Sequence, residues 1–219
     1  MLRKALFAGA VILLIAAFAI GVIVDRNKRA GAPAPAARPA IDASALARFH
    51  SPTTGDAGAK VHIVEFIDPA CGTCRDFYPF VKRLMAAHPG RIRLTLRYAP
   101  FHKGADEVVR LLEAARKQGK YWPALEALLA AQDQWTVQHV ARLDLALPVV
   151  ARLGLDMERL KQDMRAPELD QLLRQDLQDA VALGVSQTPE FFVNGRPLPS
   201  FGYDELKALV EQALRDSYG

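Results

Sequence analysis

The chain has few cysteines and almost no excess charge beyond its first residues. Cys71 and Cys74 are the only cysteines among 219 residues, too few to supply the four ligands of a structural zinc site. Neither lies near the N-terminus, so a lipid-anchored lipoprotein is excluded as well. The formal net charge is +4, but residues 1–29 hold five of the 28 Lys/Arg and one of the 24 Asp/Glu. The remaining residues are neutral overall, with 23 of each sign, which excludes a nucleic-acid partner.

The longest uncharged stretch lies at the N-terminus, where Ala5–Val24 contains no charged residue. Twenty apolar residues in a helix span about 30 Å, the thickness of a bilayer core. The competing interpretation is a signal peptide cleaved after Ala17–Ala19. Apolar residues continue past that point, which favours an uncleaved membrane anchor over residues 1–29. Basic residues flank both ends and do not settle the orientation, but a short basic N-terminus favours export of the following domain.

A spacer is expected between the anchor and the domain. Residues 30–40, AGAPAPAARPA, are rich in Ala and Pro and read as an extended linker. Residues 41–50 either form a short helix or lie on the domain, so we assign residues 30–50 to the linker and 51–219 to the domain. Ser51–Ala59 contains one proline and two glycines and is predicted to be a loop.

The two cysteines lie where a predicted strand turns into a predicted helix. Val61–Ile67 is a short apolar run rich in β-branched residues. From Arg75 to about His88, apolar residues recur at helical spacing. The free N–H groups and the positive end of the helix dipole favour a thiolate at Cys71. We therefore predict that Cys71 is an exposed nucleophile of low pKa and that Cys74 is a more buried resolving thiol.

A redox role explains the cysteine spacing better than a structural role. A two-residue spacer lets the pair close into a disulfide and reopen, so that it carries two electrons. A structural bridge over so short a loop removes little chain entropy and stabilises a fold poorly.

Glu65 is the unusual residue of the predicted strand. It shares a face with Val61, Ile63 and Ile67, and a carboxylate among apolar neighbours is costly unless it has a partner or a task. One interpretation places Glu65 beneath the cysteines with a raised pKa. The other places it at an edge, where it reaches solvent.

The rest of the chain alternates short strands with helices. In Arg91–Tyr98 the even-numbered residues are apolar and predicted to face inward, and the odd-numbered residues, Arg91, Arg93, Thr95 and Arg97, are predicted to face outward. We therefore expect an outer strand parallel to the first. A helical region follows from about 102 to 184. Glu190–Val193 and Arg196–Leu198 flank Asn194-Gly195, a strong hairpin signal, and the final predicted helix covers Asp204–Leu214.

This order of elements resembles the DsbA-like family, an α/β thioredoxin fold with an inserted α-helical domain. VEFIDPACGTC resembles the family's active-site entry, and LGVSQTPEFFVNGRPLP resembles its Thr–cis-proline loop and hairpin. The resemblance implies that Pro189 is cis and packs beside the cysteines, and that the backbone of Thr188 pairs with an extended substrate. Gly72 and Thr73 are then further candidate substrate contacts.

The residues between the cysteines differ from those of the strongest oxidants in the family, which have Pro-His there. Gly72 and Thr73 supply no such charge, although the Thr73 hydroxyl offers one hydrogen bond. We therefore expect a less depressed pKa at Cys71 and a less oxidising pair. A glycine there and Thr188 before the proline also resemble bacterial disulfide isomerases, but residues 25–51 are too short for the isomerases' dimerisation domain.

The resemblance implies a membrane-tethered thiol:disulfide oxidoreductase, in which Cys71 and Cys74 exchange disulfides and Glu65 manages the Cys74 proton. We expect a single-pass protein of the bacterial inner membrane with its domain in the periplasm, or an exported protein if the signal is cleaved. The expected partners are exported proteins with thiols or disulfides and a membrane redox partner. We expect a monomer that needs no organic cofactor or metal. Oxidase activity is favoured over reductase or isomerase activity, and a copper-binding thiol module or a chaperone remains as an alternative.

Overall fold

The computed structural model describes residues 43–219. The predicted membrane anchor and residues 30–42 of the linker lie outside the described residues. Within residues 43–219, no helix is both long enough and apolar enough to cross a membrane.

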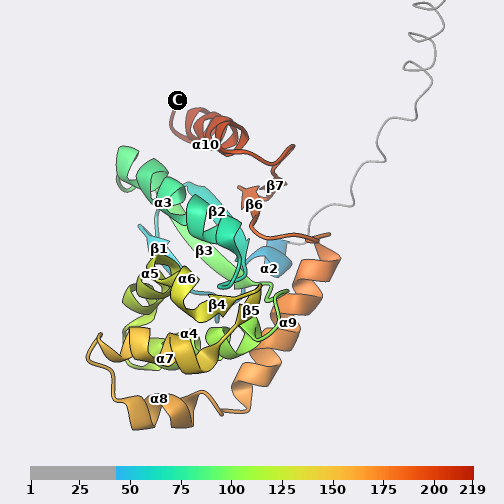
Figure 1. Cartoon of the computed structure of the whole chain (residues 1–219). Helices are drawn as coiled ribbons and strands as arrows, with labels where there is room; N and C mark the ends of the chain where they lie inside the picture. Colours follow the sequence, from blue (N-terminus) through green and yellow to red (C-terminus); the bar gives the residue numbers. More distant parts are fainter. Residues whose placement is uncertain (1–42) are drawn as a thin grey trace, which may run out of the picture. The chain divides into compact units, whose positions relative to one another are not determined.

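The centre of the domain is a five-stranded mixed sheet (Figure 1). Strand β2 (Val61–Ile67) pairs in parallel with β3 (Ile92–Tyr98) and antiparallel with β6 (Glu190–Val193). Strands β1 (Thr53–Gly55) and β7 (Arg196–Pro197) form the two edges. The predicted parallel pairing of the first two long strands is confirmed.

Strand β3 is not the outer strand that its alternating pattern predicted. The predicted loop before β2 contains β1, which pairs antiparallel with β3 and leaves it inside the sheet. Thr95 and Arg97, predicted to face solvent, are 2% and 0% exposed. The pattern gave the correct strand period, but the polar face is covered by helix α9 (Glu168–Ala182).

Arg97 tolerates burial because α9 supplies two carboxylates. Its Nη2 lies 2.8 Å from Asp176 and 2.6 Å from Asp179. Asp176 also accepts the backbone N–H of Tyr98 at 2.8 Å. Paired and hydrogen-bonded charges of this kind are the form in which charge is found inside proteins.

Both interpretations of residues 41–50 hold for the part that the structure describes. Helix α2 (Ala43–Leu46) is short, and its Ala45 and Leu46 are buried. Arg48 then pairs with Asp179 of α9 at 2.6 Å, so this segment lies on the domain.

The predicted helical insertion is largely helical and includes one hairpin. The predicted helical region is interrupted at Thr136–Val137 (β4) and Val140–Ala141 (β5), which form a two-stranded sheet. Such short strands carry too little periodic pattern to be told from a helix break. The helices of the insertion before α9 are α4 (Ala105–Lys117), α5 (Tyr121–Ala130), α6 (Gln132–Trp135), α7 (Leu143–Ala151) and α8 (Met157–Asp163).

Helices cover both faces of the sheet. Helices α3 (Gly72–Ala87) and α10 (Tyr203–Tyr218) lie together near β2, and α9 lies on the side of α2 (Figure 1). Val61, Ile63 and Ile67 belong to the larger core cluster, which also contains residues of α3 and α10. Val64 and Phe66 point to the opposite face and belong to a smaller cluster with residues of α9. Glu65 therefore lies on the face that α3 covers.

The C-terminal hairpin forms as predicted. Asn194 and Gly195 have φ values of +47° and +78°, the left-handed conformation that a two-residue hairpin turn requires at both positions. The turn brings β7 back against β6. Strand β7 thus forms the edge of the sheet beside β6, and the Thr188–Pro189 bond lies directly before β6.

Candidate active site

The two cysteines lie at the carboxyl end of β2, where α3 begins. Cys71 is the N-cap residue of α3, and Cys74 lies one turn into the helix. Both are free thiols, with 7% of Cys71 and 0% of Cys74 exposed. Cys74 is buried as predicted, whereas the predicted exposure of Cys71 is wrong because the loop before β6 lies against it.

That loop carries Thr188 and Pro189, and the peptide bond between them is cis. The Cys71 thiol donates to the carbonyl oxygen of Thr188 at 3.2 Å. Pro189 is buried and Thr188 is partly exposed. The fold therefore brings the predicted substrate-binding loop into direct contact with the predicted nucleophile.

The surroundings of Cys71 stabilise its thiolate. A hydrogen bond from the Cys74 thiol contributes most to lowering the pKa of Cys71 from 9.0 to about 5. Burial opposes this, and a hydrogen bond with the Thr188 side chain and the N–H groups of Cys74 and Thr73 add to the lowering. Thr73 contributes through its backbone and its side chain is exposed, so the expected hydroxyl contribution is not the one observed.

The pKa values of Cys74 and Glu65 are raised, in contrast to that of Cys71. Burial raises the pKa of Cys74 well above its usual value, and its hydrogen bond to Cys71 adds to the effect. Burial also raises the pKa of Glu65 from 4.5 to about 8, with a further contribution from the charge of Cys71. Glu65 is 0% exposed, so the edge-position interpretation is wrong. Neither of its carboxyl oxygens has a hydrogen-bond partner among the described residues.

Asp68, which the sequence analysis did not single out, organises the loop between β2 and Cys71. Its buried carboxylate accepts the N–H of Ala70 at 2.8 Å, the N–H of His102 at 2.7 Å and a bond with His102 Nδ1 at 2.8 Å. Its backbone carbonyl accepts the N–H of Cys71 at 3.0 Å. An Asp followed by Pro after a buried strand is a signal of a side-chain-stabilised turn, and that signal was available in the sequence.

Gln132, at the start of α6, contacts the same loop from the helical insertion. Its Nε2 donates to the carbonyl oxygens of Pro69 at 2.8 Å and Cys71 at 3.0 Å. Gln132 is 3% exposed. A contact across 61 residues has no local sequence signal.

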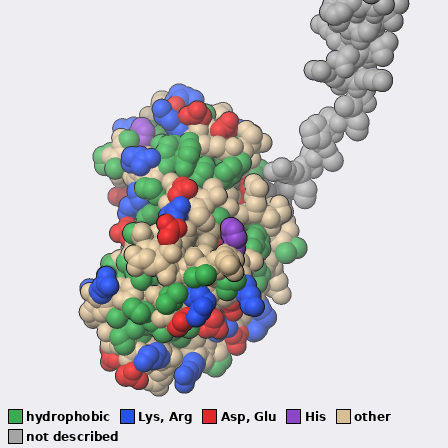
Figure 2. Space-filling model, in the orientation of Figure 1, with side chains coloured by type: hydrophobic (Ala, Val, Ile, Leu, Met, Phe, Trp, Pro, Cys, Tyr) green, Lys and Arg blue, Asp and Glu red, His purple; other side chains and the backbone are tan. Residues whose placement is uncertain are grey.

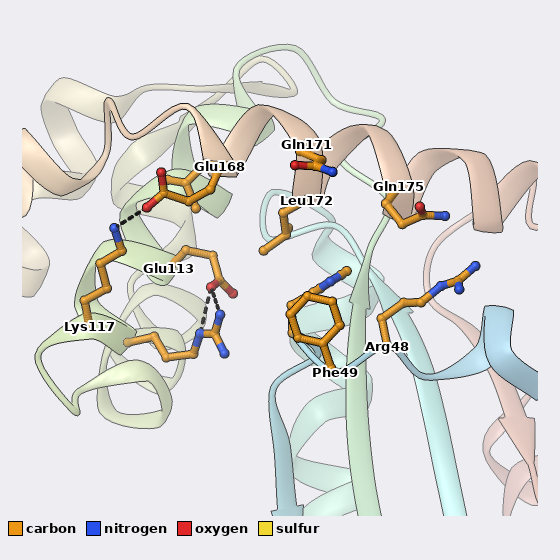
Figure 3. A pocket seen from close by; sticks show the side chains of 11 residues that line it. Arg48, Phe49, Glu113, Lys117, Glu168, Gln171, Leu172 and Gln175 are labelled. Carbon is orange, nitrogen blue, oxygen red and sulfur yellow. Dashed lines mark hydrogen bonds and ion pairs between the residues drawn. The ribbon is translucent and has the colours of Figure 1, made fainter.

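The surface has two further features that do not involve the cysteines. A pocket of about 590 Å³ is lined by residues of α4, α9 and the segment after α2 (Figure 3). Its charged side chains are paired, Lys117 with Glu168 and Arg116 with Glu113, and none of the predicted site residues lines it. The face drawn in Figure 2 carries basic and acidic side chains side by side, in keeping with the balanced charge of the domain.

Within residues 43–219, no three His, Cys, Asp or Glu side chains are grouped as a metal site would require.

The chain is similar to known thioredoxin-fold proteins over most of its length. A thioredoxin family model matches residues 49–212. The crystal structure of a thioredoxin-like oxidoreductase from Silicibacter pomeroyi is 32% identical and matches with a TM-score of 0.69, covering 80% of this chain and 98% of that one. A probable disulfide bond formation protein D from Bacillus anthracis is 28% identical over 74% of this chain and 77% of its own length.

A further group of relatives carries the name Na⁺/H⁺ antiporter NhaA. The example from Herminiimonas arsenicoxydans is 32% identical over 162 residues, which is 74% of this chain. The chain spans about a quarter of the length of these curated relatives, 25% in that example. Together with the cysteines, the cis-proline loop and the helical insertion, the family match leads to one conclusion. The chain belongs to the thioredoxin family and has the fold of its DsbA-like members.

Proposed function

We propose that the protein donates disulfide bonds to exported proteins through Cys71 and Cys74. The observation that carries this proposal is the environment of Cys71, whose thiolate is stabilised by hydrogen bonds from the Cys74 thiol, the Thr188 side chain and the first N–H groups of α3. A stabilised thiolate is a good leaving group, and its stability favours the reduced form of the pair. Both properties suit a pair that passes its disulfide on.

The size of the effect on the reduction potential follows from the pKa of Cys71. A thiol of pKa about 5 in place of about 9 stabilises the reduced pair by about 3 kcal/mol at pH 7. For a two-electron couple this corresponds to about 60 mV toward a more oxidising potential. The gain remains below that expected for a motif with Pro-His, because Gly72 and Thr73 add no positive charge.

The exchange proceeds in two displacements. A substrate thiolate attacks Cys71 Sγ in the oxidised pair, the Cys71–Cys74 bond breaks, and Cys74 leaves as a thiolate that takes a proton. Glu65, protonated at neutral pH because of its raised pKa, is the proposed source of that proton. A second substrate thiolate then attacks the substrate sulfur of the mixed disulfide. Cys71 leaves as a thiolate, the substrate is oxidised, and the pair has gained two electrons.

The cis-Pro189 loop is the proposed substrate-binding element. An extended substrate would lie along the backbone at Thr188 as an added strand, which places its sulfur beside Cys71. Gly72 and the exposed Thr73 side chain are the proposed contacts on the other side of the cysteines.

We propose that the protein acts on the outer side of the bacterial inner membrane, held there by residues 1–29. The pair must then pass its two electrons to a membrane redox partner before the next cycle. The antiporter relatives are named for proteins about four times longer than the matched segment, so transport is not carried over to this chain.

The equilibrium reduction potential of the full-length chain in glutathione buffers tests the direction of electron flow. A value of about −120 to −180 mV supports a donor of disulfides. A value near about −270 mV contradicts the proposal and indicates a reductant. In parallel, scrambled-disulfide refolding by the reduced chain reports isomerase activity, which the oxidase proposal expects to be weak.

A further inference from the structure

We propose that Gln132 is a positioning residue for the redox pair and that through it the helical insertion controls the reactivity of Cys71. The inference rests on the proposed function only in taking Cys71 as the cysteine that forms the mixed disulfide and leaves it as a thiolate. It concerns a residue in a different part of the chain from the cysteines and the cis-proline loop.

Gln132 is hydrogen-bonded to the loop that leads into α3. Its amide Nε2 donates to both Pro69 and Cys71, two carbonyls of the loop that leads into α3. The side chain is 3% exposed, so these bonds form where water does not compete freely. Removing the amide would leave buried carbonyls short of a donor, which is costly in a protein interior.

The Cys71 carbonyl lies at the start of α3. It also accepts the N–H of Arg75 at 3.2 Å, the bond that begins α3. Gln132 therefore holds the peptide group from which the helix starts and fixes the direction of the first N–H groups. Among these, the N–H groups of Thr73 and Cys74 stabilise the Cys71 thiolate. The hydrogen bond from Gln132 to the Cys71 carbonyl oxygen also polarises this peptide group, which adds to the partial positive charge at the start of α3.

Helix α6 is held in place by contacts on two sides. Trp135 is 0% exposed and its Nε1 donates to the carbonyl oxygen of Leu128 at 2.8 Å, which secures α6 to α5. On the other side, Asp133 lies 2.7 Å from Arg75 in the first turn of α3. Gln132 thus projects from an element that is held at both ends, as a side chain that positions another group requires.

Gly72 gives an independent sign of close contact. A Cβ atom built on Gly72 would lie 3.9 Å from Gln132 Oε1, the nearest side-chain atom to it. The amide of Gln132 therefore lies beside the turn between the two cysteines.

The test compares Gln132→Met with Gln134→Met in the full-length chain. Methionine keeps the length of glutamine and removes the amide, and Gln134 is an exposed residue of the same short helix. The reduced proteins are alkylated with iodoacetamide between pH 4 and pH 9, and the modified cysteine is identified by mass spectrometry. For Gln132→Met we expect the midpoint of Cys71 alkylation to rise by about half a pH unit, so that the rate at pH 4 falls about threefold. The glutathione equilibrium should shift about threefold toward the oxidised pair, and Gln134→Met should match the unsubstituted protein.

A lower melting temperature with an unchanged midpoint in Gln132→Met would make the residue purely structural and overturn the inference. An equal shift in Gln134→Met would overturn it too. If Gln132→Met does not fold, Gln132→Glu keeps the size and replaces the donor with an acceptor, and an unchanged profile there has the same meaning. The unsubstituted protein separates this inference from the proposed function. A midpoint near the ordinary cysteine value in that protein contradicts the low-pKa nucleophile, whatever Gln132 contributes.

Discussion

Replacing Glu65 with glutamine should stabilise the reduced protein increasingly as the pH rises. Glu65 is 0% exposed, its carboxyl oxygens have no hydrogen-bond partner among the described residues, and burial raises its pKa to about 8. In the unfolded chain it should titrate near 4.5. Below pH 4.5 both states hold the proton and the carboxyl group carries no ionisation penalty.

Between these two pKa values the unfolded chain loses its proton while the folded protein keeps it. The free energy of unfolding of the unsubstituted protein should therefore fall by about 1.4 kcal/mol per pH unit from this group, and level off above pH 8. Glutamine does not titrate. The advantage of Glu65→Gln should thus grow from pH 5 onward and reach about 3 kcal/mol near pH 7.

Urea denaturation of the reduced proteins at pH 5, 6, 7 and 8 measures this difference. Glu158→Gln is the matched control, because Glu158 lies on the surface of α8 with 87% of its side chain exposed. A difference between Glu65→Gln and the unsubstituted protein that stays constant with pH would refute the argument, since it would mean that Glu65 titrates normally. The same variant should slow disulfide exchange if Glu65 supplies the Cys74 proton.

Two further predictions concern the cysteines and the buried ion pairs. Cys71→Ser should abolish turnover in insulin reduction, whereas Cys74→Ser should accumulate mixed disulfides, visible as high-mass bands on non-reducing gels. The absence of such bands would contradict the exchange mechanism. Arg97→Met should lower the free energy of unfolding by about 3–5 kcal/mol in urea, because it leaves Asp176 and Asp179 with one cationic partner fewer inside the protein. A loss below about 1 kcal/mol would show that the network contributes little.

Much of the active site was predictable because its signals are local. A short β-branched strand, a two-residue spacer and a helical repeat follow one another within Val61–His88, and α3 begins at Gly72 as this pattern requires. Asn194-Gly195 likewise identified its hairpin, since few residues adopt positive φ easily. The apolar neighbours of Glu65 left open whether it is buried or reaches solvent at an edge, and the structure shows that it is 0% exposed.

Other features depended on contacts between distant segments. The alternation in β3 indicated an exposed face, but β1 and α9 cover the strand, and Arg97 is buried because Asp176 and Asp179 reach it from residues about eighty positions later. The covering of Cys71 by Thr188 required the chain to return to β2 across 117 residues.

The sequence by itself determined the chemistry of this protein, since the residue types and spacing of Cys71 and Cys74 at a strand–helix junction are local properties. Only the tertiary structure decided how that chemistry is tuned. The pKa values of Cys71 and Glu65 depend on burial and on the groups that surround them. The contact of Gln132 with the active-site loop depends on how the insertion packs. Burial and hydrogen bonding between distant residues arise when the chain folds, because no single segment contains both partners.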